Sequence, residues 1–298
     1  MNLRDLEYFY QLSQLQSFTA VAKCFNVSQP TISYAVKRLE ALFHCELVFK
    51  DPAKRVVSLT PQGNILANHS KEILEEIERL NKALKQSWVT KAQIGFPPII
   101  ASYVLSQMLV KQMSVSFLSE LQTIHGGSNE LLSKLLDVDM ELSLLGSLKP
   151  LSHPKLETVT LWQKDFFLVL SEHHPLAGSK TLSFADVLSE KFILLDERHI
   201  HLNAFNFLNS QHHQLAQILV QLDDVYMVGQ MIKENLGIGL LTEISFPQKL
   251  EGVVKIPLQE RDIQFYISYA YLKTRHLSTS SKKLLTILEE IEETTKRA

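Results

Sequence analysis

The side chains best suited to chemistry lie in residues 25 to 40, FNVSQPTISYAVKRLE. Ser28 can cap a helix, and Pro30 falls in its first turn, where a missing N–H costs no hydrogen bond. Ile32, Val36 and Leu39 recur at helical spacing, which predicts the buried face of that helix. The other faces carry polar, amide, phenolic and cationic groups that can bind base edges and phosphates in a major groove: Gln29, Thr31, Ser33, Tyr34 and Lys37.

Two earlier helices must position this one. Apolar residues at helical spacing predict the first helix over residues 3 to 14, and Ser17 can cap the second. Asn26 can end the second helix, because asparagine tolerates the left-handed conformation. Helices joined by such a short turn form a helix-turn-helix, which places its second helix in the major groove. The alternative is a small three-helix packing unit with a solvated polar face.

A basic hairpin follows. Residues 46 to 63, ELVFKDPAKRVVSLTPQG, contain two short β-rich runs around Asp51-Pro52, with Lys50, Lys54 and Arg55 at or beside the predicted tip. Such a wing can clamp phosphates beside a recognition helix. Between residues 17 and 64, six lysines and arginines oppose three carboxylates, a net charge of +3.

The stretch SFTAVAKCFNVSQPTISYAVKRLEALF, then a wing, then LTPQG, resembles the N-terminal domain of LysR-type transcriptional regulators. The resemblance implies a winged helix-turn-helix over residues 1–60, with Gly63 letting the next helix approach the phosphates. For two of the residues below, a structural role is the alternative to DNA contact. Pro30 would then only shape the helix start, and Arg38 would only pair with a nearby carboxylate. The DNA contacts that the resemblance implies are Gln29, Pro30, Thr31, Ser33, Tyr34, Lys37 and Arg38 in the helix, Lys50 and Arg55 in the wing, and Thr60, which can also cap the next helix.

Some positions depart from the usual pattern of that family. His44 and Cys45 replace a glycine and a small or apolar residue, which leaves the turn into the wing open. Val48 replaces the usual Phe before the wing, and Lys50 replaces the usual Arg. The last change weakens a bidentate phosphate contact, because lysine is a point charge.

Residues 61–88 predict a long linker helix. Its apolar seam steps by four and three and is narrow enough to need a partner helix. An intramolecular helix could supply the partner, but a homodimer is favoured because the helix projects from a small domain. Such a dimer presents two recognition helices to a nearly palindromic site, and the resemblance also implies a homotetramer. The seam positions are Leu66, Ser70, Ile73, Ile77, Leu80 and Leu84.

From residue 91 onward strands and helices alternate, which predicts an α/β fold. The resemblance implies an effector-binding domain over residues 91–298, two-lobed and similar to periplasmic binding proteins. It places lobe I over residues 91–161 and 271–298 and lobe II over residues 162–270. A small-molecule effector would bind in the cleft between the lobes.

Candidate effector residues fall at predicted helix starts and strand ends. Helix N-terminal amides and nearby hydroxyls can hold an anion, and ligands of α/β sheets bind beyond strand ends. Ser128 alternatively only caps a helix beginning at Asn129, and the two alternatives are equally favoured. Residues 196–201 alternatively form an exposed loop. The candidates are Pro98, Ile99, Ser102, Ser128 and Asn129 in lobe I, and Arg198, His199 and His201, which suit a carboxylate, in lobe II.

Composition and motifs exclude other classes. A net charge of −2 excludes a uniformly basic surface that coats nucleic acid. Two cysteines are too few for a disulfide framework and fit the cytoplasm, and Cys24 is expected in the core. The histidine pairs lack partners at metal-site spacing, and LGIGLL lacks a third glycine, so neither a metal nor a cofactor is expected. No nucleophile motif indicates an enzyme. Pro97-Pro98 interrupts the longest uncharged run, so no membrane span is expected.

The resemblance therefore implies a regulator of double-stranded DNA controlled by a small-molecule effector. The stretches YFYQLSQLQSFTAVAKCF and VSQPTISYAVKRLE are similar to the malolactic-fermentation regulators of lactic acid bacteria, a subgroup that implies a dicarboxylate effector, L-malate. One alternative is a small-molecule-binding or enzymatic α/β protein whose N-terminal helices only dimerise. Another is a constitutive repressor with a vestigial cleft.

Overall fold

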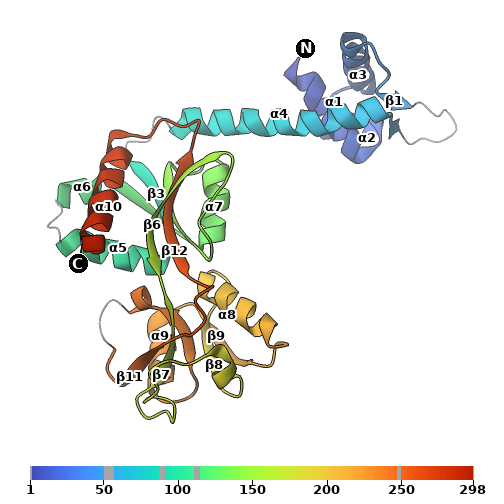
Figure 1. Cartoon of the computed structure of the whole chain (residues 1–298). Helices are drawn as coiled ribbons and strands as arrows, with labels where there is room; N and C mark the ends of the chain where they lie inside the picture. The colour runs from blue at the N-terminus through green and yellow to red at the C-terminus, as the bar shows by residue number, and fades with distance from the viewer. Residues whose placement is uncertain (1, 50–56, 87–90, 111–114, 247–249, 298) are drawn as a thin grey trace. The chain divides into compact units, whose positions relative to one another are not determined.

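The computed structural model describes residues 2–49, 57–86, 91–110, 115–246 and 250–297 (Figure 1). The chain divides into two compact units, Met1–Trp88 and Val89–Ala298. Among the helices so described, none combines the length and the apolar character needed to cross a bilayer.

The first unit begins with the predicted three helices, α1 (Leu3–Leu15), α2 (Phe18–Cys24) and α3 (Gln29–Phe43). Both predicted caps are confirmed, since the Ser17 side chain accepts from the Ala20 N–H and that of Ser28 from the Thr31 N–H. Asn26 has the expected left-handed conformation, with φ 53°. The stripe of α3 packs into a core with α1, made of Leu6, Phe9, Leu12, Ile32, Val36 and Leu39.

Two local expectations for this unit need comment. Cys24 is exposed, so its predicted place in the core is wrong. It lies two residues beyond buried Ala22, a rotation of about 200° around the helix. His44, which stands where the resembled family has glycine, is left-handed with φ 53° and donates its N–H to the Glu40 carbonyl. The turn into the wing is therefore kept despite the missing glycine.

The hairpin and the long helix complete the unit. β1 (Val48–Phe49) pairs antiparallel with β2 (Ser58–Leu59), and α4 follows over Pro61–Gln86. Gly63 in its first turn lies against the hairpin, because a Cβ added there would come within 2.1 Å of the Leu47 carbonyl oxygen. This close approach to Leu47 requires glycine at position 63. Along the predicted seam Ser70 is buried, whereas Ile73, Leu80 and Leu84 are exposed.

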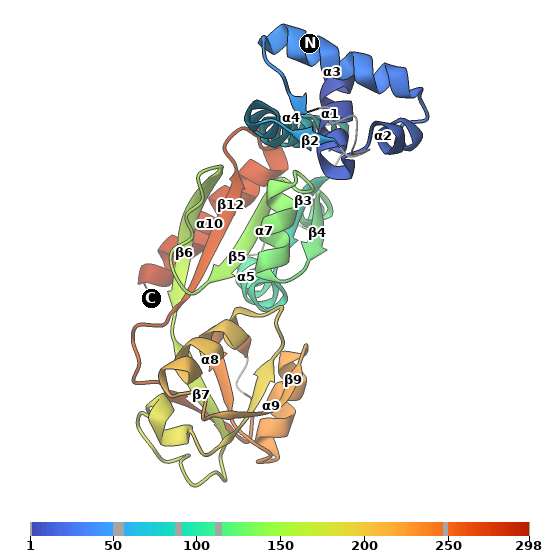
Figure 2. The same cartoon turned by 90° about the vertical axis from the view of Figure 1, so that its right-hand side faces the viewer.

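The second unit has two lobes. Lobe I is a five-stranded sheet in the order β4-β3-β5-β12-β6, where β3 is parallel to β4 and β5 and β12 is antiparallel to β5 and β6. Helix α7 covers one face, and α5 and α10 cover the other (Figures 1 and 2). The elements are β3 (Ala92–Phe96), α5 (Pro98–Val110), α6 (Val115–Ser119), β4 (Leu121–His125), α7 (Ser128–Leu136), β5 (Leu142–Ser147), β6 (Leu156–Lys164), β12 (Phe265–Leu272) and α10 (Thr279–Arg297).

Lobe II is built around the order β10-β7-β11 and the parallel pair β8-β9. A bridge between Phe192 and Ile238 links the two groups of strands. Its elements are β7 (Phe166–Ser171), η1 (Phe184–Val187), β8 (Lys191–Leu195), α8 (Ile200–Gln211), β9 (Gln217–Leu222), α9 (Val225–Lys233), β10 (Gly239–Thr242), η2 (Glu243–Ser245) and β11 (Val253–Pro257).

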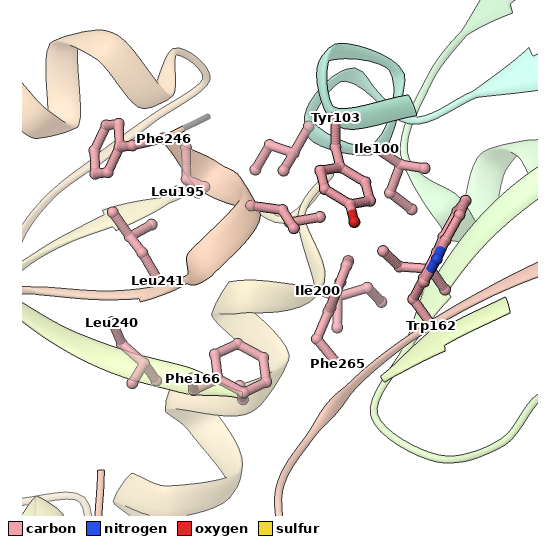
Figure 3. Close-up of a cluster of buried hydrophobic side chains, with 14 of the residues drawn as sticks. Ile100, Tyr103, Trp162, Phe166, Leu195, Ile200, Leu240, Leu241, Phe246 and Phe265 are labelled. Carbon is pink, nitrogen blue, oxygen red and sulfur yellow. The ribbon is translucent and has the colours of Figure 1, made fainter. Parts of the chain in front are cut away.

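The two crossings between the lobes lie side by side. β6 runs in the lobe I sheet to Lys164, where it pairs with Phe265 at the start of β12. The paired strands β6 and β12 extend past the expected lobe boundaries at residues 162 and 270, so the ladder of lobe I reaches to Lys164 and Phe265. Apolar side chains join the lobes here, and Figure 3 shows Ile100, Tyr103, Trp162, Ile200 and Phe265 among them. The rings of Tyr103 and Trp162 meet edge to face at 5.5 Å.

Candidate functional site

The N-terminal half of α3 presents the predicted polar face. Gln29, Pro30, Tyr34 and Lys37 are exposed, and Thr31 and Ser33 are half-buried. The Lys37 ammonium lies 5.8 Å from the centre of the Tyr34 ring, so the cation and the phenol share one patch. The patch offers donors and acceptors of the kinds that hydrogen-bond to base edges and phosphates.

Arg38 is already paired inside the unit. Its Nε donates to Oδ2 of Asp5 at 2.9 Å and its Nη2 to Oδ1, a two-pronged pair with a carboxylate that is only 4% exposed. This ion pair agrees with the alternative stated above, in which Arg38 only pairs with a nearby carboxylate. Removing the partner of a buried carboxylate strongly destabilises the folded protein.

Arg38→Ala is therefore expected to lower the melting temperature of the first unit by several degrees, whereas Lys37→Ala leaves it nearly unchanged and weakens DNA binding instead. Thermal unfolding of both variants by circular dichroism, with DNA affinity beside it, checks this. Equal melting temperatures with equal losses of affinity would assign Arg38 to DNA.

The remaining candidates for DNA contact are Thr60, Lys50 and Arg55. Thr60 is 4% exposed, its hydroxyl donates to the Glu46 carbonyl at 2.7 Å, and it accepts from the Gly63 N–H at 2.9 Å. Thr60 therefore caps α4, as predicted, and its side chain is buried between the hairpin and the helix start. Lys50 and Arg55 lie outside the described residues.

In the second unit, helix N-termini from both lobes meet around a cavity of about 470 Å³. α5 belongs to lobe I, and α8 and α9 belong to lobe II. Asp224 caps α9 by accepting from the Tyr226 N–H at 2.7 Å, whereas no side chain caps α8. Unpaired N–H groups at helix starts attract anions. The cavity is lined by Pro98, Ile99, Ser102, His199, Asp223, Asp224, Val225 and Ser245.

A much smaller cavity of about 20 Å³ adjoins it and shares Pro98, Ile99 and His199 with it. Its other walls come from both lobes and include Ser128, Arg198, His201 and Phe265. The lobes are in close contact beside it, since a Cβ added at Gly127 would lie 2.6 Å from the Arg198 carbonyl oxygen.

The structure contradicts the capping alternative for Ser128 and places its side chain at the small cavity. α7 begins at Ser128 and its N-cap is Gly127, so Ser128 does not cap a helix beginning at Asn129. Its Oγ instead accepts from the Gly146 N–H at 2.8 Å, and the side chain lines the small cavity. Asn129 is exposed and lines neither of these two cavities.

Arg198 and His199 share one carboxylate. Arg198 donates from Nε to Asp196 at 2.8 Å and from Nη2 to Asp223 at 3.1 Å, and His199 Nδ1 lies 2.9 Å from Asp196. Burial opposes ionisation of Asp196, but hydrogen bonds from Arg198 and His199 outweigh it and hold the pKa of Asp196 below its usual value. The guanidinium predicted to bind a ligand is therefore already neutralised by two carboxylates.

His201 is 1% exposed and packs against the rings of Phe166 and Phe265. Its Nε2 lies 3.2 Å from both Thr242 Oγ1 and Ser245 Oγ. Burial lowers the pKa of His201 to about 3, so the ring is neutral at pH 7. Its other ring nitrogen, Nδ1, has no hydrogen-bond partner among the described residues.

Sequence reasoning missed Gly127, Asp223, Thr242 and Ser245. Thr242 and Ser245 form the capping box of η2 directly after a buried strand, and that local pattern could have identified them. Nothing local signals that His201 lies against them. Within the part of the chain that the structure describes, no group of three metal-ligating side chains comes together.

Comparisons with known proteins match both units. Residues 3–64 match the model described as bacterial regulatory helix-turn-helix protein, lysR family, and residues 85–292 match LysR substrate binding domain. The chain is 50% identical to the malolactic fermentation system transcriptional activator of Lactococcus lactis subsp. lactis (strain IL1403), over 98% of this chain and 99% of that one. It is 27% identical to the DNA-binding transcriptional dual regulator OxyR of Escherichia coli (strain K12), over 86% and 85%.

Solved structures show the same fold. Full-length BenM has a TM-score of 0.58 at 20% identity, over 99% of this chain and 98% of that one, and a mutant of full-length BenM has a TM-score of 0.56. The effector binding domain of QuiR in complex with shikimate has a TM-score of 0.56 at 15% identity, over 68% of this chain and 97% of that one.

Proposed function

The chain belongs to the LysR family of DNA-binding transcriptional regulators, and we propose that a small carboxylate, with L-malate the first candidate, binds its cleft and controls genes of malolactic fermentation. The observation that carries the proposal is the cavity between the lobes, where helix N-termini of α5 and α8 meet. Helix N-termini favour an anion, and the two carboxylates that line the cavity are engaged, Asp223 by Arg198 and Asp224 by the Tyr226 N–H. The relative at 50% identity is named for the malolactic fermentation system, which supports malate in particular.

Membership of this family argues against an enzyme whose N-terminal helices only dimerise. We infer that the α3 patch of Gln29, Ser33, Tyr34 and Lys37 contacts DNA in the cytoplasm, with Lys50 and Arg55 of the wing beside it. We further infer a homodimer through the exposed apolar side chains of α4, and a homotetramer built from two such dimers. Ile73, Leu80 and Leu84 support this, because an exposed apolar seam on a long helix favours a partner helix.

Fluorescence anisotropy with the intergenic DNA upstream of the gene, titrated with salt and with L-malate, tests the proposal. Specific binding should exceed binding to random duplex by roughly a thousandfold or more, and L-malate should change it. Gln29→Ala should cost about 1–3 kcal/mol of binding free energy for sequences that carry particular bases. Lys37→Ala should weaken binding to all sequences and reduce the slope of log affinity against log salt concentration by about 1. Specific binding that no small acid alters would favour the constitutive repressor.

A further inference from the structure

We propose that the small inner cavity binds one end of the effector through two uncharged donors, His201 Nδ1–H and the Ser128 hydroxyl, and therefore admits one acceptor oxygen of a compact group, a carboxylate. This inference rests on the proposed role of the cleft and names which group of the ligand lies innermost. Neither donor carries a charge, and the arginine at this cavity is already paired with Asp196 and Asp223.

The hydrogen bonds around Nε2 determine where the proton of His201 lies. The oxygens of Thr242 and Ser245 are 3.1 Å apart and each lies 3.2 Å from Nε2. Each oxygen also accepts a backbone N–H within the capping box. If Nε2 accepts a hydrogen bond from one of these two hydroxyls, the other hydroxyl can donate to the oxygen of the first. Both hydroxyl protons then take part in hydrogen bonds.

The other tautomer satisfies fewer groups. If Nε2 carried the proton, it would donate to one hydroxyl, and only one of the two hydroxyl protons would find an acceptor within the cluster of His201, Thr242 and Ser245. The proton of the neutral ring therefore lies on Nδ1, where no described residue accepts it. A buried donor without an acceptor is rare in folded proteins and marks a place where a ligand or water is expected.

The cavity suits an acceptor oxygen. Its volume of about 20 Å³ holds one water-sized group, and its apolar walls include Ile100, Ile200 and Phe265. Because Ser128 Oγ already accepts from the Gly146 N–H, its own proton is available to donate. Ser128 is also the first residue of α7, whose N-terminus favours negative charge. The adjoining 470 Å³ cavity accommodates the rest of the ligand.

Two substitutions of His201 separate its two nitrogens. His201→Asn places an amide donor near the position of Nδ1, whereas His201→Gln places its amide near Nε2 and removes the inner donor. Titration calorimetry of the full-length protein with L-malate should show affinity reduced about tenfold or more in His201→Gln and largely restored in His201→Asn. DNA affinity without acid serves as the control for folding in both variants.

A second measurement uses the unmodified protein. Nitrogen-15 NMR of histidine-labelled protein should show His201 as the Nδ1–H tautomer, with that proton shifting when L-malate is added. An Nε2–H tautomer, or equal affinities for L-malate in the wild type and His201→Gln, would overturn the inference and leave the effector class standing. If none of L-malate, succinate, citrate and L-lactate binds at millimolar concentration, the proposed effector class falls and the inference falls with it.

Discussion

Gly63→Ala is expected to destabilise the N-terminal unit by about 2–3 kcal/mol. The new Cβ would lie 2.1 Å from the Leu47 carbonyl oxygen and 3.1 Å from the Leu47 carbonyl carbon. Leu47 cannot easily retreat, because its N–H donates to Glu40 and its carbonyl accepts from the Thr60 N–H at 3.1 Å. Alanine gains about 1 kcal/mol of helix propensity over glycine, which offsets only part of the clash.

Urea unfolding of the full chain, followed by circular dichroism, measures the effect, and DNA affinity reports on the same unit. Gly178→Ala is a matched control, because no atom lies within 4 Å of a Cβ added there. The control should change the free energy of unfolding by less than about 0.5 kcal/mol. Equal unfolding midpoints for the two variants would show that the hairpin yields to the new methyl group.

The sequence predicts the N-terminal unit well where its signals are local. Caps at Ser17 and Ser28, the left-handed Asn26 and the buried stripe of α3 each depend on residues within one or two turns. The pairing of Arg38 with Asp5 joins residues 33 positions apart, so only the fold reveals which carboxylate is near. The burial of Thr60 and the contact of Gly63 with Leu47 likewise come from the hairpin folding back onto α4.

In the effector domain the sequence identified several lining residues but not their partners. Pro98, Ser102 and His199 line the large cavity because helix starts and strand ends meet at one edge of an α/β sheet. Neutralisation of Arg198 by Asp223 depends on the spacing of β8 and β9, which no single segment encodes. The ladder of β6 and β12 ends at Lys164 and Phe265, and only one residue separates β6 from β7, so no break in the sequence marks this crossing.

Gly127→Ala is expected to weaken binding of L-malate by about tenfold or more. The added Cβ would meet the Arg198 carbonyl oxygen at 2.6 Å and the Arg198 Cα at 3.0 Å, and both are backbone atoms of the other lobe. The turn carrying Arg198 is fixed by the backbone bond from His199 N–H to the Asp196 carbonyl, at 3.0 Å. The lobes must therefore separate beside the inner cavity, which moves the donors of α7 and α8 apart.

Gly126→Ala provides the matched control one residue earlier. Its Cβ would meet only the carboxylate of Glu130, the far end of a flexible and half-exposed side chain, at 2.8 Å. Calorimetry should therefore give an affinity for L-malate within about twofold of the wild type for Gly126→Ala, and a tenfold loss, about 1.4 kcal/mol, for Gly127→Ala. Both variants should bind DNA normally without the acid, because the first unit is unchanged. An equal affinity in the two variants would mean that binding does not need the contact between the Gly127 and Arg198 backbones, and that the acid binds with the lobes apart.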